Sequence, residues 1–219
     1  MGIVSTTLTG LAIAAKLPLA AAPFSCTAPT WVGKPAVNSQ NQLEAKIQST
    51  CTLKPDSAGS ISALNQSIVD SISKENTVNS GPTPESRDDL SGVSFDVTNV
   101  SEQEGDQVTI RKDLHLDSDG TSRILYVAHA TSIEGSGNAA FLKALDITQE
   151  VTQGDPEQNV FTLTVTQAVK IEKPWYAPAG VFLSQGTSKV KSSFTSLVNG
   201  MAGSMTQGLT ASAPTNRAN

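Results

Sequence analysis

The chain has 219 residues, of which 38% are hydrophobic and 16% are charged, enough apolar side chains to build the core of one domain. Its 15 basic and 20 acidic side chains give a formal net charge of −5, and no basic block stands anywhere in the sequence. Because nucleic-acid binders carry clustered Lys and Arg, the composition excludes a protein that binds nucleic acid through a basic surface.

The N-terminal residues have features of a targeting segment. An apolar run from Leu8 to Ala22 ends in small residues, which is typical of the cleavage region of a signal peptide. The run is shorter than the roughly 20 apolar residues of a membrane-spanning helix. We therefore predict a signal peptide over residues 1–22, a secreted or periplasmic location, and no stable transmembrane anchor. Lys16 interrupts the run and no basic residue precedes it, so a disordered Ala-rich N-terminus is the alternative.

Residues 23–40 are rich in Pro, Asn and Ser, which predicts an irregular arm. The chain has two cysteines, Cys26 in this arm and Cys51 in the strand that follows. In an exported protein an even pair suggests one disulfide, here between the arm and the first strand, and two unpaired thiols are the alternative. His115 and His129 have no neighbouring ligand cluster, so no metal site and no cofactor are predicted.

The first regular elements are a strand and a short helix. Apolar or small residues alternate with polar ones from Leu43 to Leu53, which predicts a half-buried strand. Four apolar residues then recur at helical spacing behind capping candidates Ser57 and Ser60, and they predict a short amphipathic helix: Ile61, Leu64, Ile68 and Ile72.

A series of strand candidates follows, each with apolar alternation and each separated from the next by a short polar turn. Such turns between consecutive strands favour an antiparallel meander. The candidates are residues 92–100, 107–117, 121–133, 139–153 and 160–173.

The last predicted element is a helix that begins near Ala179 or Thr187. Its apolar stripe consists of Val190, Phe194, Leu197, Val198, Met201 and Met205. An antiparallel sheet with one apolar face must cover that face, so this stripe is expected to lie across the sheet. Gly200 and Gly203 weaken the end of the helix, and residues 206–219 are predicted to be a disordered tail.

This order of elements resembles the helix-grip fold of the START and Bet v 1-like superfamily (SRPBCC), which includes polyketide cyclase and lipid-transport relatives. The most specific piece is the junction "KIEKPWYAPAGVF", residues 170–182, where a long strand ends in a Lys-Pro-aromatic step before the terminal helix. The resemblance implies an α+β fold over residues 41–205, with a curved antiparallel sheet of about six or seven strands gripping the C-terminal helix. It also implies a hydrophobic cavity between the sheet and that helix.

The residues expected to line this cavity come from both layers: Phe95, Ile110, Tyr126, Phe161, Val165, Phe194, Val198 and Met201. Lys112 breaks the apolar alternation of its strand. It either anchors a ligand carboxylate or reaches the rim by snorkelling, and snorkelling is the favoured interpretation. Trp175, at the corner between the last strand and the helix, is expected either to gate the cavity or to seal the end of the core.

The sequence holds no nucleophile elbow, zinc-protease motif or phosphate-binding loop, so no catalytic residue is predicted. The predicted function is non-enzymatic binding or transport of a hydrophobic small molecule or lipid. The alternative is a secreted structural or interaction protein with a filled core, which would associate with itself or with other subunits.

Overall fold

The structure is a computed structural model, and it describes residues 24–81, 92–103, 106–154 and 156–210. The predicted signal peptide, residues 1–22, lies outside the described residues, as do residues 211–219 of the predicted tail. Among the residues that are described, no helix is long and apolar enough to cross a membrane.

The described residues form one antiparallel sheet and two α-helices. The long strands are β4 (Gln42–Leu53), β6 (Val93–Gln103), β7 (Asp106–Ser118), β8 (Arg123–Gly135), β9 (Leu142–Gln153) and β10 (Phe161–Glu172). Short strands are β1 (Phe24–Cys26), β2 (Thr30–Trp31), β3 (Ala36–Val37) and β5 (Thr77–Ser80). The helices are α1 (Ile61–Glu75) and α2 (Ala179–Thr210), with single 3-10 turns η2 (Gly137–Phe141) and η3 (Pro156–Gln158).

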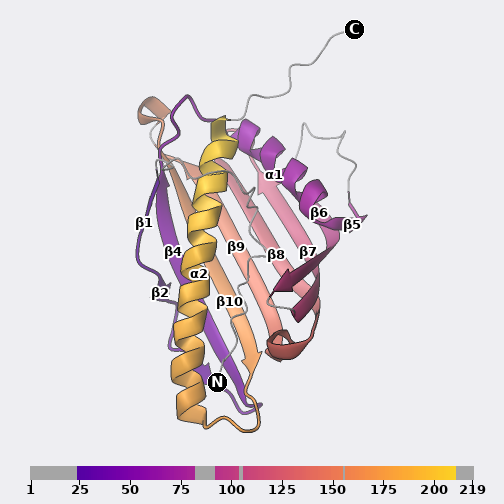
Figure 1. Cartoon of the computed structure of the whole chain (residues 1–219). Coiled ribbons are helices and arrows are strands. Elements are labelled where there is room, and N and C mark those ends of the chain that lie inside the picture. The colour runs from indigo at the N-terminus through magenta and orange to yellow at the C-terminus, as the bar shows by residue number, and fades with distance from the viewer. Residues whose placement is uncertain (1–23, 82–91, 104–105, 155, 211–219) are drawn as a thin grey trace.

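The strands lie in the order β1-β4-β10-β9-β8-β7-β6-β5, and β2 and β3 also pair with β4. The first long strand is thus the neighbour of the last one, with Leu53 opposite Phe161 and Gln42 opposite Glu172. Figure 1 shows α2 lying lengthwise over the sheet beside β4 and β10, while α1 crosses one end of it. The predicted α+β helix-grip arrangement is confirmed.

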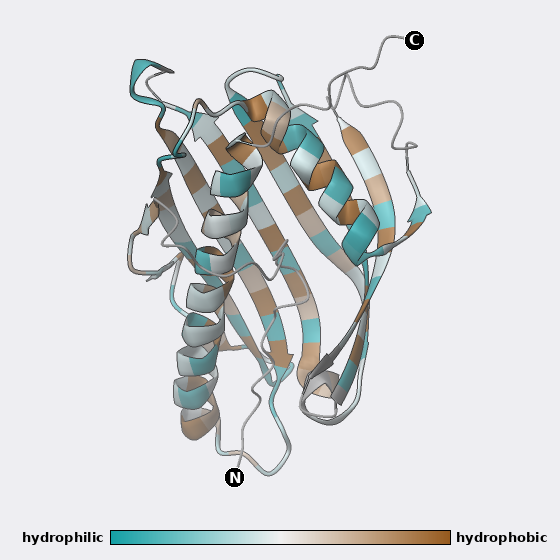
Figure 2. Cartoon of the chain, turned by 45° about the horizontal axis from the view of Figure 1, so that its top comes forward, coloured by the Kyte–Doolittle hydropathy of each residue, from teal (hydrophilic) through white to brown (hydrophobic). Residues whose placement is uncertain are grey.

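Period-two alternation explains why the sheet has one buried face. On β4 the residues from Leu43 to Leu53 are buried at every second position, and their neighbours are exposed or half-buried. The same alternation runs along β10, and it appears as bands of opposite hydropathy on the strands in Figure 2. We call the buried side the inner face and the other side the outer face.

The two helices cover the inner face with the stripes that their sequences predict. Ser60 caps α1, since its hydroxyl accepts a hydrogen bond from Ala63 N at 3.0 Å. All four apolar residues expected on this helix are at most 2% exposed, and the six of the α2 stripe are at most 3% exposed. The helices meet where Gly208 of α2 approaches Leu64 of α1.

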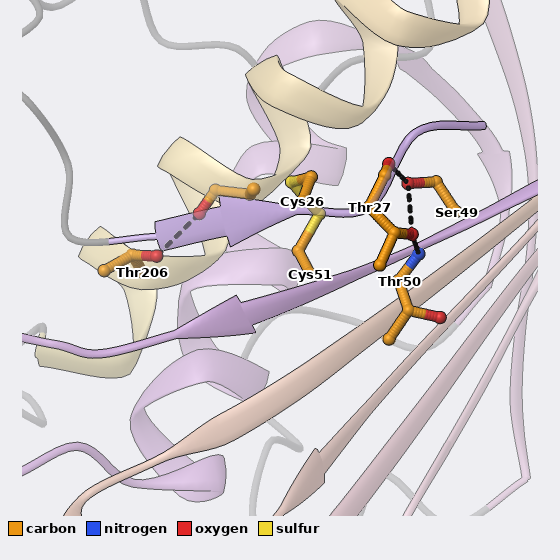
Figure 3. Close-up of a disulfide and its surroundings, with 7 residues drawn as sticks. Cys26, Thr27, Ser49, Thr50, Cys51 and Thr206 are labelled. Atoms are coloured by element: carbon orange, nitrogen blue, oxygen red, sulfur yellow. Dashed lines mark hydrogen bonds between the residues drawn. A yellow bond between two sulfur atoms is a disulfide. The ribbon is translucent and has the colours of Figure 1, made fainter.

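Cys26 and Cys51 form a disulfide, the first of the two states that the sequence left open. The two residues lie directly opposite each other in the β1–β4 pair. Figure 3 shows the bond beside the last turns of α2, near Thr206, with Thr27 and Ser49 further along the same two strands. There Ser49 Oγ donates a hydrogen bond to Thr27 O at 2.8 Å, so β1 is held by a covalent bond and by polar contacts.

Three predicted boundaries need correction. Within the described residues the sheet has ten strands and not six or seven, because four short strands join its edges. Three of these strands come from the predicted arm, residues 23–40, whose backbone pairs with β4. The helix runs past the predicted end at residue 205 as far as Thr210, since Leu209 is buried and its carbonyl accepts a hydrogen bond from Ser60 N at 2.9 Å.

Candidate ligand-binding interior

The apolar residues predicted to line a cavity come together on the inner face and on α2. All eight are at most 5% exposed and belong to a single hydrophobic cluster: Phe95, Ile110, Tyr126, Phe161, Val165, Phe194, Val198 and Met201. The strands contribute five of them and α2 contributes three. The interior between sheet and helix is therefore a closed apolar region made from the residues that the sequence singles out.

Trp175 does not join this region. Its side chain is 92% exposed and packs edge-to-face on Tyr176, with ring centroids 5.7 Å apart. The turn before α2, which Ala177 N closes on Pro174 O at 3.0 Å, carries both rings on the outside of the domain. Neither gating of an interior cavity nor sealing of the core fits this position.

The corner between β10 and α2 is sealed by other residues. Phe182, in the first turn of α2, is 1% exposed and packs with Leu43 and Ala177 in a small cluster of its own. The sequence analysis missed this role of Phe182. A signal was present, since Phe182 stands eight residues before Val190, in phase with the α2 stripe.

Two glutamines interrupt the apolar inner face. Gln149 on β9 is 1% exposed and Gln167 on β10 is 0% exposed. In the described part of the chain, the amide nitrogen and the amide oxygen of both side chains have no hydrogen-bond partner. Gln149 lies opposite Tyr126 and Val165 in the sheet, and Gln167 lies opposite Ile47 and Ile147.

These unpaired amides are costly for an apolar core. A buried polar group left without a partner costs about 1–3 kcal/mol, and most such groups in folded proteins are paired. The sequence analysis missed both glutamines, although their signal is plain in retrospect. Each stands at an apolar phase of its strand, in "LDITQEV" and "VTQAV".

Lys112 lies on the inner face of β7 and is 3% exposed. The favoured prediction that it snorkels to the rim is wrong, because the strand directs it between Val97 of β6 and Ala130 of β8. Burial lowers the pKa of its ammonium to about 8, against the opposing effect of the negative charge of Glu75 at the end of α1.

The negative charge of Glu75 affects the pKa of both Lys112 and Tyr126. Burial raises the pKa of the Glu75 carboxyl, and the nearby ammonium of Lys112 opposes that change. Burial, followed by the charge of Glu75, also raises the pKa of the Tyr126 hydroxyl. Lys112 and Tyr126 thus lie on the inner face beneath the C-terminal end of α1, and the exposed Glu75, the last residue of that helix, acts on both through its charge.

Other buried polar side chains make hydrogen bonds with each other or with the backbone. Asn65 Nδ2 of α1 donates to Ser118 Oγ at 2.8 Å, and Ser118 Oγ donates to Arg123 O at 3.1 Å. Asn99 Nδ2 donates to Glu75 O at 2.9 Å. These contacts fix α1 to the sheet and leave fewer free atoms than the two glutamines do.

The outer face of the sheet carries both histidines and several ion pairs. His115 Nδ1 contacts Ser94 Oγ at 3.1 Å, and His129 pairs with Asp146, so both histidines face away from the interior.

A hollow of about 310 Å³ on this side is lined by Val32, Lys34, Glu44, Ala45, Lys46, Ala144, Asp146, Ala168, Val169 and Lys170. In the described part of the chain, no three His, Cys, Asp or Glu side chains cluster in a way that could hold a metal ion.

No protein-family model matches the sequence, and no curated protein matches it significantly. Solved structures match the fold at low identity. The human StarD13 (DLC2) lipid transfer and protein localization domain is 11% identical over 82% of this chain and 89% of its own, with a TM-score of 0.39. Truncated norcoclaurine synthase from Thalictrum flavum is 10% identical over 81% of this chain and 100% of its own, also with a TM-score of 0.39.

A START superfamily protein from Mycobacterium smegmatis is 13% identical over 74% of this chain and 96% of its own, with a TM-score of 0.32. At these values the matches carry no argument about function, and the helix-grip arrangement rests on this chain's own sheet and helices. Proteins of the START and Bet v 1-like superfamily, which the sequence resembles, are among the solved structures that its fold matches.

Proposed function

We propose that the chain binds a hydrophobic small molecule or lipid between the inner face of the sheet and α2, and that it carries this molecule without changing it chemically. The observation that supports the proposal is the pair of fully buried glutamines, Gln149 and Gln167, whose amide atoms find no partner among the described residues. A ligand with an apolar body and a polar group would pair with these amides while burying its body against the cluster around them.

The test is to look for a bound molecule and for stabilisation by one. Protein purified without detergent should release an apolar compound into organic solvent, and native mass spectrometry should show the corresponding mass on the folded chain. The stripped protein should then be heated with single-chain and polycyclic lipids. A ligand at a hundred times its Kd adds about 2.7 kcal/mol of stability, which raises the Tm by roughly 5–10 °C for a chain of this size. No bound mass together with no shift in Tm would contradict the proposal.

One observation favours the second candidate, an interaction protein with a filled interior. The eight apolar residues predicted to line the cavity are at most 5% exposed, as they would be in a fully packed core. Such a protein would bind none of the lipids above and would instead form oligomers as its concentration rises, which sedimentation measures directly.

We also propose that the chain is exported. The Cys26–Cys51 disulfide supports this proposal, since such bonds persist in oxidising compartments. Expression of the full chain in a host with a secretory pathway, followed by mass measurement of the mature protein, tests it. Export predicts loss of about the first 22 residues, in keeping with a small-residue cleavage region, and an intact chain retained in the cytosol would contradict it.

A further inference from the structure

Lys112 occupies an irregular position in the sheet. Arg111 pairs with Ser132 of β8, whereas Lys112 pairs with Ala130, so Thr131 is an extra residue that forms a β-bulge opposite the two. Thr131 Oγ1 donates to Arg111 O at 3.2 Å and supports the bulge. Bulges are common beside binding sites because they re-aim a side chain out of the regular ladder.

The positive charge of Lys112 is not neutralised by contact. In the part of the chain that the structure describes, its ammonium has neither a hydrogen bond nor an ion pair, and its electrostatic neighbour is Glu75. Two lysines of the outer face differ, since Lys143 contacts Glu172 at 2.9 Å and Lys170 contacts Glu44 at 3.1 Å. Lys143 and Lys170 thus have anionic partners in contact, and the buried Lys112 does not.

A buried ammonium without a contact partner is unfavourable, and an anion that reaches it gains more than it would in water. The side chains next to Lys112 on the inner face are apolar: Val97, Ile110, Leu114 and Ala130. An anion that binds there must therefore belong to a molecule whose remaining part is apolar.

We propose that the interior ligand is an aliphatic carboxylic acid, whose carboxylate binds the Lys112 ammonium while its apolar body lies along the inner face toward β9 and β10. This inference rests on the proposed function and specifies its ligand class. Lys112 is then the residue that determines specificity for the head group, and Gln149 and Gln167 lie further across the sheet.

The experiment compares matched probes that differ only in the head group. Hexadecanoic acid and hexadecanol are titrated into the stripped full-length protein, and the free ligand is measured by equilibrium dialysis. The wild type should bind the acid at least tenfold more tightly than the alcohol. Lys112→Met should reduce this ratio to near one while leaving the affinity for the alcohol unchanged. Lys170→Met, which removes an exposed lysine of the outer face, is the matched control and should leave the ratio as it is.

A second variant separates anchoring from a structural role of the lysine. Glu75→Gln removes the competing negative charge near Lys112, so it should increase the affinity for the acid several-fold and leave that for the alcohol unchanged. Equal binding of acid and alcohol by the wild type, or equal loss of both in Lys112→Met, would overturn the carboxylate inference alone. If the protein bound neither probe and no other lipid, the proposed function would be overturned as well.

Discussion

Replacing the buried glutamines by methionine should stabilise the ligand-free protein. Methionine has nearly the shape of glutamine and no amide, so Gln149→Met and Gln167→Met remove the unpaired atoms without opening a cavity. Both positions lie within the hydrophobic cluster of the inner face and are at most 1% exposed. Their cross-strand neighbours are Tyr126, Val165, Ile47 and Ile147, so the new side chains would meet a largely apolar setting.

The expected gain follows from the cost of unpaired polar groups. Each variant removes one carboxamide whose nitrogen and oxygen are both unsatisfied among the described residues. At about 1–3 kcal/mol for each buried group, each variant should gain about that much in the free energy of unfolding. For a domain of this size the Tm should rise by roughly 2–12 °C.

Urea denaturation of the stripped protein, with and without a bound lipid, measures the effect in both states. Gln48→Met on the outer face of β4 is the control, since Gln48 is half-buried; its substitution should change the stability by less than about 0.5 kcal/mol. The interior variants should gain stability without lipid and bind lipid less tightly than the wild type. A loss of more than about 1 kcal/mol without lipid would refute the reasoning, because it would show that the amides are already satisfied.

Three further changes test other parts of the structure. Lys112→Met should be more stable than the wild type at pH 7, and denaturation curves should show this advantage shrink by about 3 kcal/mol between pH 7 and pH 11. The pKa of Lys112 in the folded protein is about 8 and lies below the ordinary 10.5. The wild type therefore gains stability as pH rises through that window, in which Glu75 stays ionised. Reducing the disulfide should cost about 3–4 kcal/mol in denaturation curves, given the sequence separation of 25 residues, and an unchanged curve would contradict its structural role. Gly208→Ala should lower the free energy of unfolding by about 1–2 kcal/mol, since the added Cβ would lie 2.9 Å from Leu64 Cδ1. Gly200→Ala is the control: an added Cβ there meets nothing within 4 Å, so the free energy of unfolding should rise by up to about 1 kcal/mol.

The parts of the fold that follow from periodicity were predictable from the sequence. The long strands and both helices have apolar residues at regular spacing, and that spacing decides which face is buried. The strands β2 and β3 were not predictable, since each has two residues and pairing with β4 alone makes them strands. The end of α2 was missed for a related reason. Gly200 and Gly203 lower helix propensity, yet the missing side chain of Gly208 allows the contact with α1 that keeps the last turn folded.

The candidate site was predictable where it is apolar and not where it is polar. The burial of Phe95 and Phe194 is predicted by their apolar side chains and by their positions in the apolar repeat, and both are buried as expected. Lys112 was assigned to the rim because a lysine is rarely buried without a partner. No prediction was made for Gln149, although it also stands at an apolar phase of its strand. Trp175 was expected to gate the cavity or to seal the core because it stands at the corner between β10 and α2, but the turn that holds it is set by backbone contacts that composition does not reveal.

The polar groups of the interior fall into two kinds, and the difference bears on function. Asn65, Ser118 and Asn99 lie where α1 meets the sheet and make hydrogen bonds that hold this helix in place. Gln167 makes none among the described residues, and Lys112 has neither a hydrogen bond nor an ion pair there. Apolar side chains of similar size are expected to stabilise the domain at both buried positions. Sites where a chain departs from the rules of its own fold without a structural gain are where binding is to be sought. The departure here runs along the inner face from β7 to β10, and a molecule with an apolar body and an acidic end matches it in both chemistry and direction.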